Sequence, residues 1–364
     1  MSLIRELLAK AVELGASDIH LKPDRDPYFR VSARLVESGF APLTREDLEG
    51  IVKDMLPPHL AQTFQEEHEA DFSYEEEGIG RFRTNVFMAQ YIPNIVMRYV
   101  KTSVPSVAEL GLPPIIEKLA TAPRGVIIMS GTTGSGKSTT LAAMIQRINH
   151  TEQRRIITLE DPVEYIFPDD QSLITQREIG LDTLSFGAAL KRVMRQDPDI
   201  IMIGELRDHL SFQAGLAASE TGHLVFTTLH AGTASQSVYR ILDLFPSSER
   251  EQMRMAIATN LHAIVCQRLI PAIRGGVVPA CEILINTPTV RKLLIKNQLE
   301  VLSAAIETGN EDGMQTFNQH LYTLIRSGTI SEADGMENAT NPEQLRMNLQ
   351  GIFLDEGKRI LSSI

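Results

Sequence analysis

The sequence predicts an α/β protein, in which a doubly wound core with a parallel sheet follows a small α+β domain and precedes a helical region. Four apolar runs of strand length alternate with stretches of helical periodicity, as in parallel sheets that helices cover on both faces. These runs are residues 125–130, 155–159, 200–203 and 224–228. A cluster of prolines and a glycine between residues 102 and 124 separates this pattern from the first hundred residues. We therefore expect an N-terminal domain over residues 1–101, a linker over 102–114, a core over 115–270 and a C-terminal helical region over 271–364.

The composition excludes several classes of protein. A chain of 364 residues is long enough for two or three domains, and its net charge of −11 argues against a general nucleic-acid binder. Cys266 and Cys281 cannot supply a four-thiolate zinc site, so we expect both to be buried apolar residues in a reducing compartment. The first residues lack the features of a secretory signal, and no apolar run approaches the length of a membrane span. We expect a cytoplasmic protein that binds neither nucleic acid nor zinc.

The first domain is predicted from short alternating patterns. Ile4, Leu7, Leu8 and Ala11 recur at helical spacing, and apolar and polar residues alternate from Arg81 to Met88, as in a half-buried strand. The predicted elements are a helix over 3–14, strands over 19–21 and 28–31, a helix over 45–67 interrupted at Pro57-Pro58, and paired strands over 81–88 and 95–100.

The helices of the core and of the C-terminal region follow from 3.6-residue periodicity. In the core, we expect a short helix over 114–121 and longer helices over 137–149, 185–196, 209–220 and 233–243. After residue 247 helical patterns dominate, and they predict helices over Met253–Leu269, 289–296, 316–327 and 342–361.

A phosphate-binding loop connects the first core strand to the helix that follows it. The pattern G-x-x-x-x-G-K-[ST] is complete in residues 131–138. Glycines allow the backbone to wrap closely round phosphates, so that its N–H groups and the helix N-terminus face the anion. Lys137 would reach the β- and γ-phosphates of ATP, and the Ser138 hydroxyl would ligate Mg²⁺. The expected nucleotide-binding residues are Gly131, Thr132, Thr133, Gly134, Ser135, Gly136, Lys137, Ser138 and Thr139.

Acidic residues follow two other core strands. Residues 199–205 describe a buried strand that delivers Glu205 to the magnesium side of the site, although a surface pairing with Arg207 is the alternative. Glu160, Asp161 and Glu164 surround Pro162, and acids so close together repel one another unless a metal or an arginine compensates them. One of the three should polarise the attacking water and the others should orient Mg²⁺, but spacing alone does not choose among them.

Two histidines and three arginines complete the set of candidates. His223 and His230 flank the strand over 224–228, where a sensor of the γ-phosphate would lie, although a single histidine is more often structural. Arg81, Arg83 and Arg98 lie on adjacent predicted strands of the first domain. They form either a solvated cationic face or arginine fingers that stabilise the transferring phosphate in a neighbouring subunit.

Taken together, these motifs resemble the type II/IV secretion ATPase superfamily, and most closely its pilus-retraction branch, PilT and PilU. The likeness covers nearly the whole chain in the family's order. Its segments include Gly15–His20, Gly80–Asn85, the P-loop, Ile157–Tyr165, Gln176–Glu178, Ile203–Arg207, Glu220–Leu224, Thr228–His230 and Gly313–Phe317.

The resemblance implies a PAS-like N-terminal domain, a RecA-like ATPase core and a homo-hexameric ring. It assigns Glu164 as the catalytic glutamate, Glu205 as the Walker B acid, and Glu160 and Asp161 to magnesium and its waters. It places His223 and His230 in a histidine box, and Arg81, Arg83 and Arg98 at phosphate contacts. It also implies ATP and Mg²⁺ as cofactors, an inner-membrane platform protein as partner, and a paralogous retraction ATPase as a further partner.

The choice between the PilT and PilU branches rests on weaker signals. Residues 180–183, 283–288 and 316–322 are closer to PilU, and the PilT motif A-I-R-N-L-I-R appears only approximately, as Thr289–Ile295. The missing four-cysteine module favours retraction over pilus assembly or type II secretion, which remain the alternative functions. A nucleotide-gated adaptor of a paralogous motor is the non-enzymatic alternative.

Overall fold

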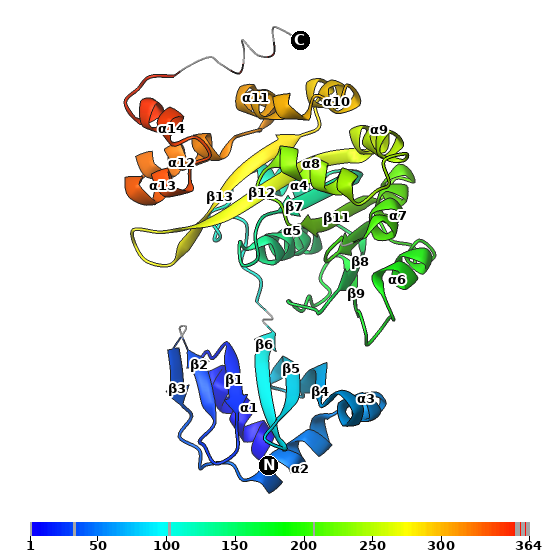
Figure 1. The fold of residues 1–364 in the computed structure, drawn as a ribbon, viewed down its shortest axis with the longest axis vertical. Coiled ribbons are helices and arrows are strands. Elements are labelled where there is room, and N and C mark those ends of the chain that lie inside the picture. The colour runs from blue at the N-terminus through cyan, green and yellow to red at the C-terminus, as the bar shows by residue number, and fades with distance from the viewer. Residues whose placement is uncertain are drawn as a thin grey trace. The chain divides into compact units, whose positions relative to one another are not determined.

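The computed structural model describes residues 2–31, 34–100, 103–206 and 208–353, together with Gly357 and Leu361. These residues form two compact units (Figure 1). Unit 1 comprises Met1–Ser103 with Glu164–Ile166, and unit 2 comprises Val104–Val163 with Phe167–Ile364.

Unit 1 is an antiparallel sheet with helices packed on one of its faces. The strand order is β3-β2-β1-β6-β5-β4. Its core forms because α1 and α2 turn apolar stripes towards the inner face of the sheet, where Phe29, Phe82 and Met97 are fully buried. The elements are α1 (Leu3–Glu13), β1 (Asp18–Leu21), β2 (Tyr28–Val31), β3 (Arg34–Glu37), α2 (Arg45–Met55), a 3-10 turn (Pro58–Leu60), α3 (Ala61–Glu67), β4 (Glu69–Glu76), β5 (Gly80–Ala89) and β6 (Ile92–Val100).

The predicted elements of unit 1 are all present, and two strands were missed. Along β5, Phe82, Thr84 and Val86 are buried whereas Arg83 is exposed, which confirms the predicted alternation. The sequence did not predict β3, which is exposed throughout, or the acid-rich β4. Residues 32 and 33, between β2 and β3, lie outside the described part of the chain.

Unit 2 is built on a seven-stranded sheet in the order β13-β12-β7-β11-β10-β8-β9. All neighbours are parallel except β12 and β13, which are antiparallel. Both faces are covered, because Val126 and Ile128 of β7 join the core that α6, α7 and α8 share, while Ile127 and Met129, also buried, point to the opposite face. The strands are β7 (Gly125–Ser130), β8 (Arg155–Glu160), β9 (Leu173–Glu178), β10 (Ile200–Ile203), β11 (Leu224–Leu229), β12 (Leu261–Pro271) and β13 (Val277–Ile285).

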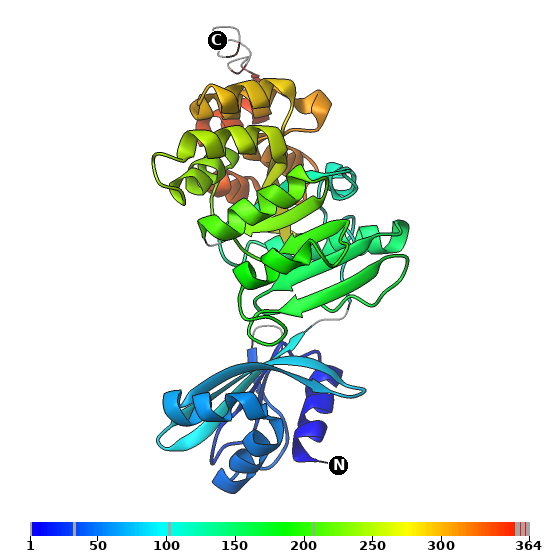
Figure 2. The ribbon, with the colours of Figure 1, turned by 90° about the vertical axis from the view of Figure 1, so that its right-hand side faces the viewer.

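The helices of unit 2 follow the predicted order up to residue 243. The C-terminal helices, orange to red, gather beside β13 and away from β9 (Figures 1 and 2). The helices are α4 (Ile115–Ala120), α5 (Lys137–Thr151), α6 (Phe186–Val193), α7 (His209–Glu220), α8 (Ala234–Asp243), α9 (Arg250–Asn260), α10 (Pro288–Ile295), α11 (Leu302–Thr308), α12 (Phe317–Arg326), α13 (Glu332–Asn338) and α14 (Pro342–Leu349), with 3-10 turns at Leu299–Val301 and Asn310–Asp312.

The helix predicted over Met253–Leu269 is wrong in its second half. The helix α9 ends at Asn260, and the chain continues as β12 from Leu261. A short apolar run buried on both faces has no periodicity that distinguishes a strand from a helix, and Ala263–Cys266 is such a run. The region over 271–364 is consequently not all helical, because β13 lies within it. Of the helix predicted over 342–361, the structure has α14, which ends at Leu349, and half of the remaining residues fall outside the described part of the chain.

The two cysteines lie in these C-terminal strands. Cys266 and Cys281 are free thiols with no exposed surface, as expected. Burial raises the pKa of both, that of Cys281 to about 12, so they are protonated parts of the core. Among the described residues, no helix combines the length and apolarity that crossing a membrane requires.

Candidate active site

The candidate residues of unit 2 meet at one edge of its sheet. Because β7, β11, β10 and β8 run parallel, the residues that follow them gather at their carboxyl ends. The register aligns these ends, with Leu229 beside Ser130 and Ile203 beside Leu159. The structure therefore brings together the P-loop after β7, His230 after β11, Glu205 after β10, and Glu160 and Asp161 at the end of β8.

Two glycines allow the P-loop to wrap closely, because a side chain at either position would meet neighbouring atoms. A Cβ on Gly131 would lie 2.5 Å from the carbonyl oxygen of Gln267 and from Ser135 Oγ. A Cβ on Gly136, whose φ is +86°, would lie 2.7 Å from Gln267 Nε2. Thr132, Thr133 and Gly134 are exposed, and Ser138 and Thr139 are half-buried on the first turn of α5.

Lys137 lies inside this loop. Its side-chain Nζ donates hydrogen bonds to the carbonyl oxygens of Gly131 and Thr132, both at 2.9 Å. The ammonium group and the N–H groups at the start of α5 together favour an anion at the mouth of the loop. Ser135 Oγ is buried and has no hydrogen-bond partner within the described part of the chain. These features fit the phosphates of a nucleotide.

Glu205 and His230 meet at the same edge. His230 Nε2 lies 3.4 Å from Glu205 Oε1, and both side chains remain partly exposed. Glu160 is buried at the end of β8, where its Oε1 accepts hydrogen bonds from Thr158 Oγ1 at 2.6 Å and Gln176 Nε2 at 3.1 Å. Asp161 is exposed. Arg207, the alternative partner for Glu205, lies outside the described residues.

Glu164 follows β8 and is exposed, which does not distinguish it from the neighbouring Asp161. Its assignment as the catalytic glutamate therefore rests on the family resemblance and stays a prediction.

His223 does not lie at the P-loop of its own chain. It precedes β11, and its carbonyl oxygen accepts a hydrogen bond from the Gly125 N–H at the beginning of β7. A strand of six residues, about 20 Å long, separates it from His230 at the other end. Its Nδ1 instead contacts the Ala218 carbonyl oxygen at 2.8 Å and Thr221 Oγ1 at 3.1 Å. The two histidines thus lie at opposite ends of β11, as expected, and a nucleotide contact of His223 stays a prediction.

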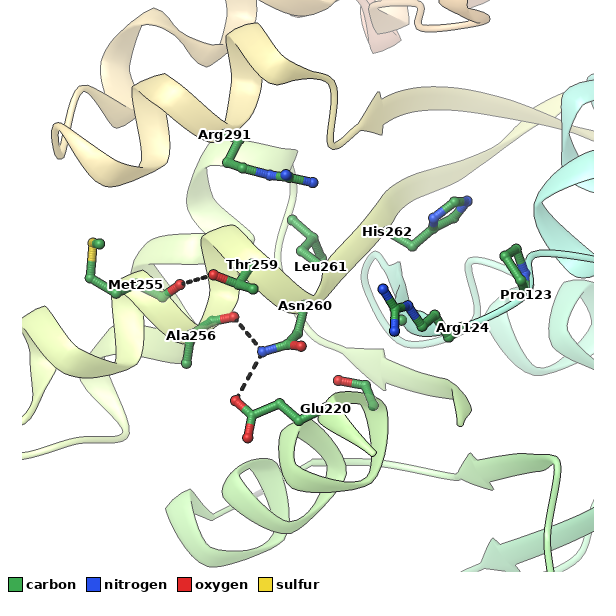
Figure 3. Close-up of a pocket in the computed structure, with 12 residues that line it drawn as sticks. Pro123, Arg124, Glu220, Met255, Ala256, Thr259, Asn260, Leu261, His262 and Arg291 are labelled. Carbon is green, nitrogen blue, oxygen red and sulfur yellow. Dashed lines mark hydrogen bonds between the residues drawn. The ribbon is translucent and has the colours of Figure 1, made fainter. Parts of the chain in front are cut away.

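A pocket of about 650 Å³ lies at this opposite edge of the sheet (Figure 3). The beginnings of β7 and β12 and the ends of α7 and α9 form its walls, and Arg124 and Arg291 line it. Asn260 Nδ2 donates to Glu220 Oε1 at 3.0 Å, and burial lowers the pKa of His262. Because it adjoins the amino ends of the strands, this pocket is separate from the nucleotide site.

The three predicted arginines of unit 1 lie on neighbouring strands, as expected. Arg83 on β5 stands directly opposite Arg98 on β6, and Arg81 is two residues before Arg83. Arg98 Nε donates to Asp18 Oδ1 at 2.8 Å, a contact that the sequence did not predict. Like charges directly opposite each other destabilise a sheet, so the Arg83–Arg98 pair favours an anion nearby.

Gln267 is a residue of the site that the sequence analysis missed. It lies on β12 with 3% of its surface exposed, and its Nε2 donates to the Ser135 carbonyl oxygen at 2.8 Å. Its Oε1 accepts from Thr140 Oγ1 of α5, also at 2.8 Å. The available signal was an uncharged polar residue, next to Arg268, within the otherwise apolar segment 263–270, but the helix predicted there concealed it.

Comparison with known proteins identifies the family. The family profile described as "Type II/IV secretion system protein" matches residues 69–338. The Type IV pilus retractation ATPase PilT of Pseudomonas aeruginosa is 39% identical over 340 residues, which cover 93% of this chain and 99% of that protein. The Type IV pilus ATPase PilU of the same organism is 40% identical over 346 residues, which cover 95% and 91%.

The chain belongs to the type II/IV secretion ATPase family. The crystal structure of the pilus retraction motor PilT with bound ADP matches with a TM-score of 0.87 and 40% identity, over 95% of this chain and 99% of that chain. The ATPase DotB of Legionella pneumophila matches with a TM-score of 0.75 and 26% identity, over 91% and 94%. Within this family the parallel sheet of unit 2 is the RecA-like ATPase core. The identities to PilT and PilU differ by one percentage point, so they do not separate these two branches.

Proposed function

We propose that this chain is the ATP-hydrolysing motor of type IV pilus retraction. The observation that carries the proposal is the common sheet edge, where the P-loop, Glu205 and His230 converge. The relatives favour retraction of the pilus over its assembly. They include a retraction ATPase that matches over 93% of the chain and a crystal structure of a retraction motor with bound ADP.

The chemistry is in-line attack of water on the γ-phosphate of ATP. The P-loop amides and Lys137 bind and orient the phosphates, so catalysis comes mainly from positioning and charge stabilisation. Glu164 orients the attacking water in this proposal. His230, in contact with Glu205, reports the state of the γ-phosphate to the end of β11.

Magnesium fits the oxygen ligands of the site. The half-buried Ser138 hydroxyl and the Glu205 carboxylate would hold it together with phosphate oxygens, and Glu160 and Asp161 would orient its waters. Bound there, the ion neutralises the charge that develops on the phosphates.

The proposed assembly is a homo-hexamer at the inner membrane. Arg81, Arg83 and Arg98 would stabilise charge on the phosphate, and a platform protein in the membrane would couple domain rotation to withdrawal of pilin subunits. A paralogous retraction ATPase is the second proposed partner, and we propose the PilU-like role for this chain. The protein would be peripheral to the inner membrane and would be held there by its contacts with the pilus machine.

Deletion of the gene in its own organism tests whether the motor retracts pili or assembles them. We expect more surface pili and loss of twitching motility, because subunits are no longer withdrawn from the filament. Complementation with the wild-type gene should restore both phenotypes, whereas complementation with Lys137→Ala should restore neither. Loss of pili on deletion would contradict retraction and support assembly.

A further inference from the structure

Strand β12 contacts the P-loop from one of its faces and α8, the helix that follows the His230 loop, from the other. Neighbouring residues of a strand point to opposite sides of the sheet, and Cys266 and Gln267 are such neighbours. Gln267 faces the P-loop, as described above. Cys266 faces α8, where its Sγ lies 4.0 Å from Ser237 Oγ.

On the Gln267 side, one side-chain amide joins the two halves of the phosphate cradle. Its donor binds the last turn of the loop at Ser135 and its acceptor binds the first turn of α5 at Thr140. The same amide fills the space beside Gly136. Gln267 therefore fixes the distance between loop and helix, on which alignment of the phosphate-binding amides depends.

On the Cys266 side, a buried chain of hydroxyl groups leads to the loop that carries His230. Ser130 Oγ donates to the carbonyl oxygen of Ala231, the residue after His230, at 3.0 Å. That bond uses the only hydrogen of Ser130 Oγ, so Ser130 Oγ can only accept from Ser237 Oγ, which lies 2.9 Å away and shares its own single hydrogen with the Thr233 carbonyl oxygen at 2.8 Å. Ser130 is the last residue of β7, so its hydrogen bond to Ala231 joins the P-loop strand directly to the His230 loop.

Glu282 of β13 holds the other end of that loop. It stands opposite Cys266 in the hairpin, and its Oε1 accepts a hydrogen bond from the Ala234 N–H at 2.8 Å. The loop between His230 and α8 is thus fixed at Ala231 by Ser130 and at Ala234 by Glu282. Both fixed points keep His230 within reach of Glu205.

We propose that Gln267 and Ser130 are positioning residues with separate roles in ATP hydrolysis. Gln267 sets nucleotide affinity by holding the P-loop against α5. Ser130, oriented by Ser237, sets the rate of turnover by holding the His230 loop against Glu205. The proposal rests on the function proposed above and assigns its two requirements to two strands, nucleotide binding to Gln267 on β12 and hydrolysis to Ser130 on β7.

The test separates the dissociation constant for a fluorescent ADP analogue from kcat for ATP, both measured on the purified full-length protein. Gln267→Met keeps the approximate volume but loses both hydrogen bonds, so we expect Kd to rise about tenfold while kcat at saturating ATP changes less than threefold. Ser130→Ala should leave Kd within twofold and lower kcat about tenfold.

Three further variants make the result decisive. Ser130→Thr retains the hydroxyl and should restore most of kcat. Ser237→Ala should lower kcat as Ser130→Ala does. Ser235→Ala removes a hydroxyl from the same helix, but one that donates to the Leu299 carbonyl oxygen instead, and should behave as wild type. Thermal melting of each variant confirms that it is folded.

Proportional changes of Kd and kcat in both main variants would overturn the proposal, because they would indicate general loosening of the site. Unchanged values in either main variant, or no rescue by Ser130→Thr, would also overturn it. If the wild-type protein binds ADP but shows no turnover, the proposed function fails instead. ADP binding by Gln267→Met would still decide the role of Gln267.

Discussion

At the scale of single residues, Lys137 is the side chain on which the nucleotide site most depends. Its ammonium group lies within the P-loop, and in Lys137→Ala the β- and γ-phosphates lose their charged donor. We expect ATP turnover to fall at least about 100-fold, to background. Steady-state ATPase assays measure this, and Lys118→Ala, an exposed lysine on α4, is the control. Retained turnover would remove the loop from the catalytic site.

Residues of the site could be predicted where they are neighbours in the sequence, but not where strand pairing brings them together. The P-loop is local: the eight residues from Gly131 to Ser138 form its pattern, so spacing alone identified them. Gln267 contacts the loop only because β12 pairs with β7, 132 positions away from Ser135 in the sequence. His223 and His230 were placed correctly at the two ends of one strand, because a short apolar run marks that strand in the sequence itself.

At the scale of elements, the packing of α12 on β13 contains a buried histidine. His320 is 8% exposed, and its Nδ1 accepts a hydrogen bond from the Cys281 N–H at 2.9 Å. Burial lowers its pKa from 6.5 to about 4. The folded state therefore keeps the imidazole neutral over a range where the unfolded chain takes up a proton.

We predict that this histidine weakens the fold as the pH falls from 6.5 towards 4. Between these values the unfolded state binds more protons, so the free energy of unfolding decreases by about 3 kcal/mol in total, and the contribution is fully present above pH 6.5. His320→Asn keeps an acceptor for Cys281 but does not titrate. Denaturant unfolding across this range should show a shallower pH dependence for the variant, and equal slopes would contradict the prediction.

Elements were predictable where their periodicity was unambiguous. The four central strands and the helices between them lie where expected. Gly or acidic residues mark the ends of these strands, and capping residues such as Thr233 of α8 mark the beginnings of the helices. The strand β12 was not predictable in this way, since it follows α9 without a turn signal. Its identity depends on pairing with β7, which no local pattern of residues encodes.

At the scale of the whole molecule, the arginines of unit 1 make a prediction about assembly. Arg83 and Arg98 face each other across two strands, and only one of them is balanced by the buried Asp18 in the contacts described above. If these arginines stabilise the γ-phosphate in a neighbouring subunit, hydrolysis requires the ring. ATP turnover per subunit should then fall on dilution as hexamers dissociate, in parallel with the oligomer fraction.

Arginine variants distinguish a shared site from a general effect of dilution. Arg83→Ala should lower turnover about 10²- to 10³-fold while the ring still assembles, because transition-state charge is lost but the subunit contacts remain. Arg34→Ala, on the exposed edge strand β3 of the same sheet, is the matched control and should retain turnover. Mixing Arg83→Ala with Lys137→Ala subunits should restore part of the activity, since some sites then combine an intact P-loop with an intact arginine from the next subunit. Turnover per subunit that stays constant down to monomers, or no recovery in mixed rings, would show that the arginines act within their own chain or form only a solvated face.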